Sequence, residues 1–276
     1  MDLFQAIILG IIQGFTAWIP VSSKTQVIIF GTLLYKLPFQ QLLSFALIVH
    51  VGDVLASLWL FRKEINSIVR VRPGLNDLSK YDSLDENKKL AYFLAISLFF
   101  SALVGIPVYL FLRHSLSELA ATTLLAVAGC LLILMGVVMF FSKYDTGNGK
   151  AGARAAIIAG MAQGLAVLPG ISRSGITESA LLLQNIDQER AVRLSFLMGL
   201  PMIAGAIVLF NFTDGYGSLD LPVAIAGIFS STITAYLTMS FMIRLAKTIK
   251  FHWFAIILGL IAIIPFVLAT FFGIGV

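Results

Sequence analysis

Two short turns in this chain, each containing a proline, carry polar and ionisable side chains within apolar sequence. The first turn and its flanks hold amides, hydroxyls and one ammonium group: Gln13, Thr16, Ser22, Ser23, Lys24, Thr25 and Gln26. The second holds an amide, hydroxyls, a guanidinium and a carboxylate: Gln163, Ser172, Arg173, Ser174, Thr177 and Glu178. Hydroxyls, backbone N–H groups at helix N-termini and an arginine fork together form an anion site that suits phosphate best. If the turns face each other, Lys24 and Arg173 need an anion between them, because like charges repel.

Both turns belong to a repeated segment of the chain. Residues 6–24 read "AIILGIIQGFTAWIPVSSK" and residues 156–174 read "AIIAGMAQGLAVLPGISRS". The similarity continues downstream, where "SFALIVHVG" (44–52) corresponds to "SFLMGLPMIAG" (195–205). Duplicated segments broken by glycine and proline in so apolar a chain indicate a membrane protein with its site at the interface of the repeats.

The elements that must position these turns are membrane helices. The chain is 59% hydrophobic and 12% charged, which excludes an ordinary soluble domain. Spanning helices need about 20 apolar residues, and six runs qualify: 42–61, 91–112, 120–141, 192–211, 221–243 and 252–273. Two further apolar segments, 3–35 and 155–184, are each interrupted by a polar turn. Each predicts a re-entrant pair of half-length helices. The irregular backbone between the two helices must be buried in protein or line a wet cavity, because it cannot face lipid.

The sequence therefore predicts an all-α integral membrane protein with an inverted-topology repeat. Repeat one (1–141) and repeat two (155–276) each contain one re-entrant hairpin and three spans within a single membrane domain. An odd number of spans inverts the second copy relative to the first.

The distribution of positive charge predicts the orientation. With the N-terminus outside, the inside loops are 62–90, 142–154, 185–193 and 244–251, and these carry 15 of the 19 Lys and Arg residues. Outside loops carry only Lys36 and Arg113. This asymmetry favours both termini outside the cell membrane. The net charge of +5 is explained by these loops, and we expect no nucleic-acid partner.

The second turn resembles a known family signature. "LPGISRSGIT" (168–177) is similar to the Pro-Gly-x-Ser-Arg-Ser-x-x-Thr signature of the undecaprenyl pyrophosphate phosphatase family, also called the bacitracin resistance family. "QGFTAWIPVSSKTQ" (13–26) resembles that family's first signature, a Glu/Gln-x-x-x-Glu stretch followed by Pro-Val-Ser-Ser. The resemblance implies a plasma-membrane hydrolase that converts a polyprenyl diphosphate to the monophosphate on the outer face and so recycles a carrier lipid of the cell envelope.

The resemblance also implies roles for individual residues. Arg173 would grip the diphosphate, Ser23 would be the nucleophile, and Gln13 would occupy the first acidic position. The expected substrate-binding residues surround these three: Ser22, Lys24, Thr25, His50, Gly170, Ser172, Ser174, Thr177 and Glu178.

The first motif departs from the family pattern at positions that matter for catalysis. The family's second glutamate falls on Ala17, and its histidine falls on Gln26. A serine nucleophile needs a base or a metal, and a divalent cation such as Mg²⁺ or Ca²⁺ needs carboxylate oxygens, so we expect metal binding to be weakened. His50 and Asp53, on the next helix, could reach into the cavity instead.

Two interpretations follow from these departures. Ala17 marks either a phosphatase impaired by loss of its glutamate, or a chain that has left catalysis and carries polyprenyl phosphate across the membrane. A membrane scaffold without a ligand leaves Arg173 and the duplicated hairpins unexplained. The sequence also leaves a homodimer open.

Overall fold

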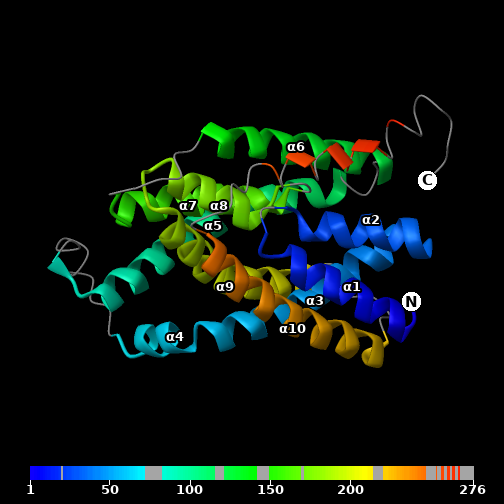
Figure 1. The fold of residues 1–276 in the computed structure, drawn as a ribbon, viewed down its shortest axis with the longest axis horizontal. Coiled ribbons are helices and arrows are strands. Elements are labelled where there is room, and N and C mark those ends of the chain that lie inside the picture. Colours follow the sequence, from blue (N-terminus) through cyan, green and yellow to red (C-terminus); the bar gives the residue numbers. More distant parts are fainter. Residues whose placement is uncertain are drawn as a thin grey trace.

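The structure, a computed structural model, describes residues 1–19, 21–71, 83–115, 121–141, 149–168, 171–213 and 220–246, with scattered positions between 253 and 267. Its helices, in chain order, are α1 (Leu3–Thr16), α2 (Ser23–Tyr35), α3 (Phe39–Leu60), α4 (Arg62–Val69), α5 (Glu86–Ser115), α6 (Ala121–Phe141), α7 (Ala153–Gly164), α8 (Arg173–Leu182), α9 (Gln188–Thr213) and α10 (Leu221–Leu245) (Figure 1). A 3-10 turn, η3 (Leu165–Val167), follows α7. No strand occurs in these ranges, which confirms the all-α prediction.

The breaks predicted within 3–35 and 155–184 are present. Helix α1 ends at Thr16 and α2 begins at Ser23, while α7 ends at Gly164 and α8 begins at Arg173. Local chemistry explains the boundaries: the Asp2 side chain caps α1, and the Ser172 hydroxyl accepts a hydrogen bond from the Gly175 N–H at the start of α8. Each pair packs as neighbouring helices, so a polar turn lies between two short apolar segments.

Four described helices are long and apolar enough to cross a membrane. They are α3, α9 as far as Phe212, α10, and α5 as far as Phe111. The expected span at 120–141 is the helix α6, and the expected span at 252–273 lies mainly outside the described residues. Large apolar side chains point outward while polar groups such as Gln13 and Asp53 are fully buried, which is the distribution of a membrane protein.

Close helix contacts through small residues support both broken pairs. Helix α1 packs along α10, and α7 packs along α5. A Cβ atom at Gly14 would overlap the carbonyl oxygen of Ser231 on α10, and one at Gly164 would meet the carbonyl oxygen of Ser101 on α5. Glycine at these two positions lets the helix backbones approach, as in other membrane-helix interfaces.

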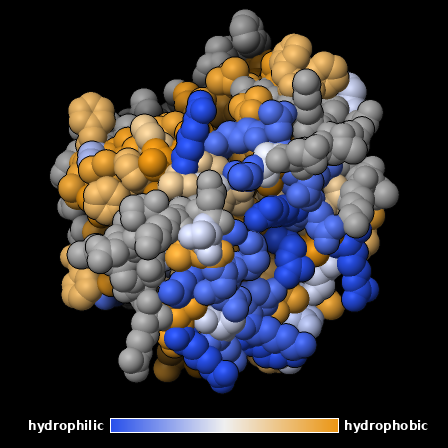
Figure 2. Space-filling view, turned by 90° about the vertical axis from the view of Figure 1, so that its left-hand side faces the viewer, coloured by the Kyte–Doolittle hydropathy of each residue, from blue (hydrophilic) through white to orange (hydrophobic). Residues whose placement is uncertain are grey.

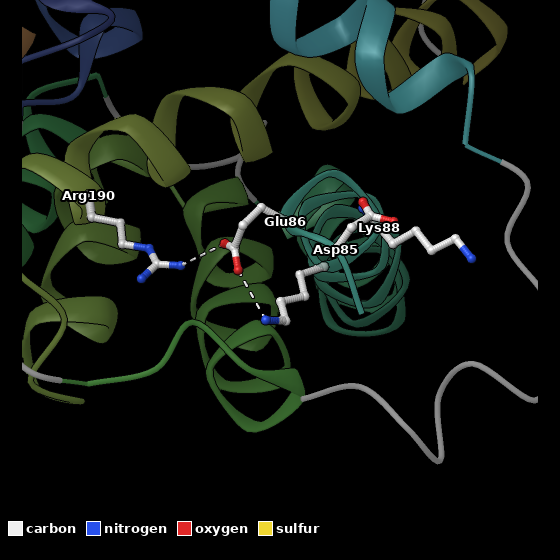
Figure 3. Close-up of polar contacts among 5 residues, drawn as sticks. Asp85, Glu86, Lys88 and Arg190 are labelled. Atoms are coloured by element: carbon white, nitrogen blue, oxygen red, sulfur yellow. Dashed lines mark hydrogen bonds and ion pairs between the residues drawn. The ribbon is translucent and has the colours of Figure 1, made fainter. Parts of the chain in front are cut away.

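One end of the molecule is polar and charged. This end lies on the left of Figure 1 and faces the viewer in Figure 2, where hydrophilic residues gather. Figure 3 shows the Glu86 carboxylate directed toward Arg190, whose Nη2 atom lies 4.0 Å away. Glu86 also pairs with Lys89 at 3.0 Å. A second pair joins Arg193 of α9 to Glu64 of α4. These ion pairs are partly exposed and contribute little stability, but they mark the end of the helices that lies in water.

Candidate active site

The two turns lie against each other. The Ser174 hydroxyl donates a hydrogen bond to the Ile19 carbonyl at 2.9 Å, and the Arg173 Nη2 donates to the Ala17 carbonyl at 3.3 Å. The contact brings the N-terminus of α8 against the turn that leads into α2. Each helix N-terminus carries partial positive charge and free N–H groups, so the junction favours an anion.

Arg173 is held by neutral groups. Its guanidinium lies 4.4 Å from the centre of the Trp18 ring, and its Nη1 donates to the Ser195 carbonyl at 3.2 Å. Trp18 in turn packs edge-on against Phe196, with ring centroids 4.9 Å apart. Within the described part of the chain no carboxylate forms an ion pair with Arg173. Contacts with neutral groups therefore position its guanidinium, and its remaining N–H groups are available to an anion.

Gly199 of α9 makes room for this arginine. A Cβ atom at position 199 would overlap the Arg173 Nη1 atom. The absence of a side chain there is therefore required by the close approach of the guanidinium. Neither Gly199 nor Trp18 was among the residues predicted from the sequence. One signal in the sequence did indicate this region of α9: residues 195–205, which begin with Ser195 and include Gly199, correspond to residues 44–52 in the repeat.

A second polar cluster forms around Gln13 of α1. The Gln13 Nε2 atom lies 2.9 Å from Asp53 Oδ2, 3.2 Å from Ser23 Oγ, and 3.3 Å from each ring nitrogen of His50. An amide nitrogen carries two hydrogens, so it can serve two of these partners at once. His50 and Asp53, which the sequence suggested as cavity residues, both reach this amide. The structure also adds Ser231 of α10, whose hydroxyl donates to Asp53 Oδ1 at 3.4 Å.

The other residues predicted around the first turn have different environments. Ser22 and Thr25 are buried, and the Thr25 hydroxyl donates to Ser22 Oγ at 2.9 Å. Lys24 is half-buried, and no hydrogen bond or ion pair joins it to the described residues. Gln26 is buried, and its Nε2 has no hydrogen-bond partner among the described groups. Lys24 and Gln26 thus hold donors that the described chain leaves unused.

The hydroxyls of the second turn bond mainly within the protein. Ser172 lies 3.1 Å from the Ser174 hydroxyl, and Thr177 donates to the Arg173 carbonyl at 2.8 Å while also contacting the Ser195 hydroxyl. Donation from these hydroxyls to a diphosphate therefore stays a prediction. Glu178 is buried, with 2% of its surface exposed, and Gly170 lies outside the described residues.

Chemically, this arrangement offers two helix N-termini and a serine hydroxyl linked through an amide to one carboxylate. It also offers one guanidinium and one ammonium that form no ion pair with the described carboxylates. Such a set can bind a phosphate group and present a hydroxyl nucleophile to it. Among the described residues no three His, Cys, Asp or Glu side chains lie close enough together to hold a metal ion.

Comparisons with known proteins agree with this chemistry. The family model described as "Bacitracin resistance protein BacA" matches residues 6–264. The chain is 37% identical over 273 residues to a protein of Saccharolobus solfataricus named undecaprenyl-diphosphatase, with 95% of each chain covered. It is 34% identical to the protein of that name from Haloarcula marismortui, covering 90% of this chain and 92% of the relative. A third, from Methanococcoides burtonii, is 31% identical, covering 96% and 98%.

Proposed function

Since the chain belongs to the bacitracin resistance protein BacA family, we propose that it hydrolyses a polyprenyl diphosphate of the undecaprenyl type to the monophosphate and inorganic phosphate. The observation that carries this proposal is Arg173, which is fixed by Trp18 and by two backbone carbonyls and has no ion-pair partner among the described residues. A cation held in this way beside a serine turn is suited to a phosphate substrate.

In the proposed reaction, Ser23 Oγ attacks the distal phosphorus and gives up its proton to a phosphate oxygen of the substrate or to water. The new Oγ–P bond replaces the bond between that phosphorus and the bridging oxygen, which leaves with the lipid monophosphate. Water then hydrolyses the phosphoserine, which releases phosphate and restores Ser23. Arg173, the N-termini of α2 and α8, and Lys24 stabilise the charge on the phosphate oxygens in the transition state. Gln13, at 3.2 Å, orients the Ser23 hydroxyl.

We also propose the membrane arrangement that the sequence predicts: six spans and two re-entrant hairpins in an inverted repeat, in the plasma membrane with both termini outside. The packing of the helices supports the repeat. The first helix of repeat one, α1, packs on α10 of repeat two, and the first helix of repeat two, α7, packs on the corresponding helix of repeat one, α5. The charged end formed by α4 and the N-termini of α5 and α9 supports the orientation. Homodimerisation stays a prediction.

A divalent cation entering with the diphosphate would find one carboxylate in the cluster, Asp53, and the Gln13 carbonyl oxygen, which is buried without a hydrogen-bond partner among the described groups. This donor set fits a cation that takes most of its ligands from phosphate oxygens and water. When bound there, the cation would neutralise phosphate charge. We propose that Mg²⁺ or Ca²⁺ binds weakly, because positions 13 and 17 lack carboxylates.

The proposed impairment at position 17 predicts a gain of activity on Ala17→Glu. The Ala17 carbonyl accepts a hydrogen bond from Arg173, so a carboxylate there would lie beside the phosphate site and could serve as base or metal ligand. We expect phosphate release from C55 polyprenyl diphosphate to rise by about 10-fold or more, with Mg²⁺ or Ca²⁺ present. Purified protein in detergent, assayed for free phosphate with and without each metal, tests this.

The matched control is Ala166→Glu, because Ala166 is an equally buried alanine beside the break in the second helix pair. No gain is expected there. If neither the wild type nor Ala17→Glu releases phosphate while both bind the lipid, the phosphatase proposal fails. The lack of a carboxylate at position 17 and of a histidine at position 26 then favours the interpretation of the protein as a polyprenyl-phosphate carrier.

Passage of labelled polyprenyl phosphate across the membrane of sealed vesicles that contain the protein would test the carrier interpretation.

The packing of Arg173 against Gly199 predicts the effect of Gly199→Ala. The added methyl would displace the guanidinium, and a shift of about 1 Å can cost on the order of 100-fold in rate. We expect kcat/KM to fall by roughly 10- to 100-fold with little change in the amount of folded protein. Gly205→Ala on the same helix is the control, since a Cβ atom there meets nothing within 4 Å. Equal activity of the two variants would contradict the role assigned to Gly199.

A further inference from the structure

We propose that Asp53 of α3 is the positioning carboxylate of this site: through the Gln13 amide it orients the Ser23 hydroxyl, and it thereby replaces the carboxylates that the first helix pair lacks. The inference rests on the proposed function and adds a residue to it. Asp53 lies outside both signature motifs, on a helix about 30 residues further along the chain than Ser23.

The burial of Asp53 requires an explanation. Its side chain is fully buried, within a helix that is long and apolar enough to span the membrane. A carboxylate in such surroundings is costly unless it is hydrogen-bonded, and it usually serves a function. Its two oxygens receive hydrogen bonds from two different helices: Gln13 Nε2 of α1 at 2.9 Å and Ser231 Oγ of α10 at 3.4 Å. Asp53 of α3 is thus hydrogen-bonded to two neighbouring helices, α1 and α10.

This carboxylate determines how the Gln13 amide is oriented. A carboxylate accepts hydrogen bonds only, so it binds the NH₂ end of the amide and turns the carbonyl oxygen away. The second amide hydrogen is then directed toward Ser23 Oγ at 3.2 Å, where the His50 ring is the competing acceptor at 3.3 Å. With Oγ accepting from Gln13, the serine proton must point elsewhere, toward the substrate or water. The hydrogen bond from Gln13 therefore favours one orientation of the Ser23 side chain.

The packing of the helices supports an effect of Asp53 on Ser23 through Gln13. A Cβ atom at Gly52, next to Asp53, would press on the backbone of α10, and one at Gly14, next to Gln13, would press on the same helix. The two residues therefore lie on helices that α10 holds in close contact. Small displacements of Asp53 relative to Gln13 are resisted by backbone packing, which is the condition for a positioning residue to act on its neighbour.

The test compares Asp53→Asn with the exchange variant Gln13→Glu/Asp53→Asn. Asp53→Asn removes the charge with almost no change in shape. Without added divalent cation, we expect kcat for C55 polyprenyl diphosphate to fall by roughly 10- to 100-fold while KM changes by less than about 3-fold, since Arg173 and Lys24 are untouched. The exchange variant returns one carboxylate and one amide to the pair, and we expect at least a tenth of the wild-type kcat.

Two further variants complete the set. Gln13→Glu alone places two carboxylates about 3 Å apart, where like charges oppose each other, and should be slower than the exchange variant. Ser57→Ala is the control, because Ser57 is a fully buried polar residue one turn along α3 whose hydroxyl bonds only the Asp53 main chain and Met239 in the described structure. Its kcat should equal that of the wild type.

A wild-type kcat in Asp53→Asn, or an exchange variant no faster than Asp53→Asn, overturns the inference. If Asp53→Asn does not fold, the exchange variant decides alone: at least a tenth of the wild-type kcat supports the inference, and a lower kcat overturns it. Wild type and Ser23→Ala are assayed alongside. A wild type that releases no phosphate defeats the proposed function itself, whereas an active wild type, an inactive Ser23→Ala and an unaffected Asp53→Asn defeat only the role of Asp53.

Discussion

Replacement of Arg173 by lysine is expected to lower kcat/KM for polyprenyl diphosphate by about 10³-fold, the lower limit for an arginine that stabilises phosphoryl transfer. The guanidinium uses one N–H group on the Ser195 carbonyl and one on the Ala17 carbonyl, and its planar fork can direct others to the phosphates. A lysine ammonium cannot keep both carbonyl contacts, stack on Trp18 and bind two phosphate oxygens at once. Steady-state phosphate release from detergent-solubilised protein measures the effect.

Arg173→Ala should go further and abolish substrate binding, measured with labelled lipid. Arg190→Lys is the matched control, because Arg190 lies at the charged end of the molecule, half exposed, and contacts Glu86 at 4.0 Å. It should retain full activity. If Arg173→Lys keeps more than a tenth of the wild-type kcat/KM, or Arg173→Ala binds lipid normally, the phosphate site lies elsewhere.

Ser23→Ala is expected to lower kcat by at least about 10³-fold while substrate still binds, because the variant removes the attacking oxygen and leaves the phosphate clamp in place. The dissociation constant for labelled lipid should change by less than about 3-fold, since the variant loses only one neutral hydrogen bond, from Gln13 to Ser23. Single-turnover assays would separate the loss of chemistry from slow product release.

The adjacent serine provides the control for this experiment. Ser22 is the N-cap residue of α2, and its hydroxyl accepts a hydrogen bond from Thr25 at 2.9 Å. Ser22→Ala should therefore lower activity by less than about 10-fold, mainly through the local geometry of the helix start. A larger loss in Ser22→Ala than in Ser23→Ala would assign the nucleophile to Ser22.

The broken helices illustrate what could be predicted locally. Proline, glycine and serine in residues 13–24 and 163–174 interrupt the apolar runs whatever surrounds them, because these residue types favour helix ends and caps over helix interiors. The helix ends at Thr16, Ser23, Gly164 and Arg173 follow from that local chemistry. The apolar composition likewise predicted long membrane helices, since the bilayer requires them.

The position of Asp53 illustrates what could not be predicted. Its distance in sequence from Gln13 says nothing about whether the two side chains meet, and the apolar residues around it do not indicate which face of α3 is directed inward. That depends on how α1, α3 and α10 pack. The same is true of Trp18 and Gly199, which contact Arg173 only because the first turn and α9 both pack against α8.

The all-α membrane class and the two interrupted segments thus follow from the sequence alone, because each depends on composition or on neighbours along the chain. The sequence also predicts a phosphate site at the two turns. The groups that surround Arg173 and the carboxylate that reaches Gln13 are known only from the three-dimensional packing, because those contacts join residues that are far apart in the chain. Helix packing, set by small residues such as Gly14 and Gly164, fixes these contacts at the scale of single hydrogen bonds.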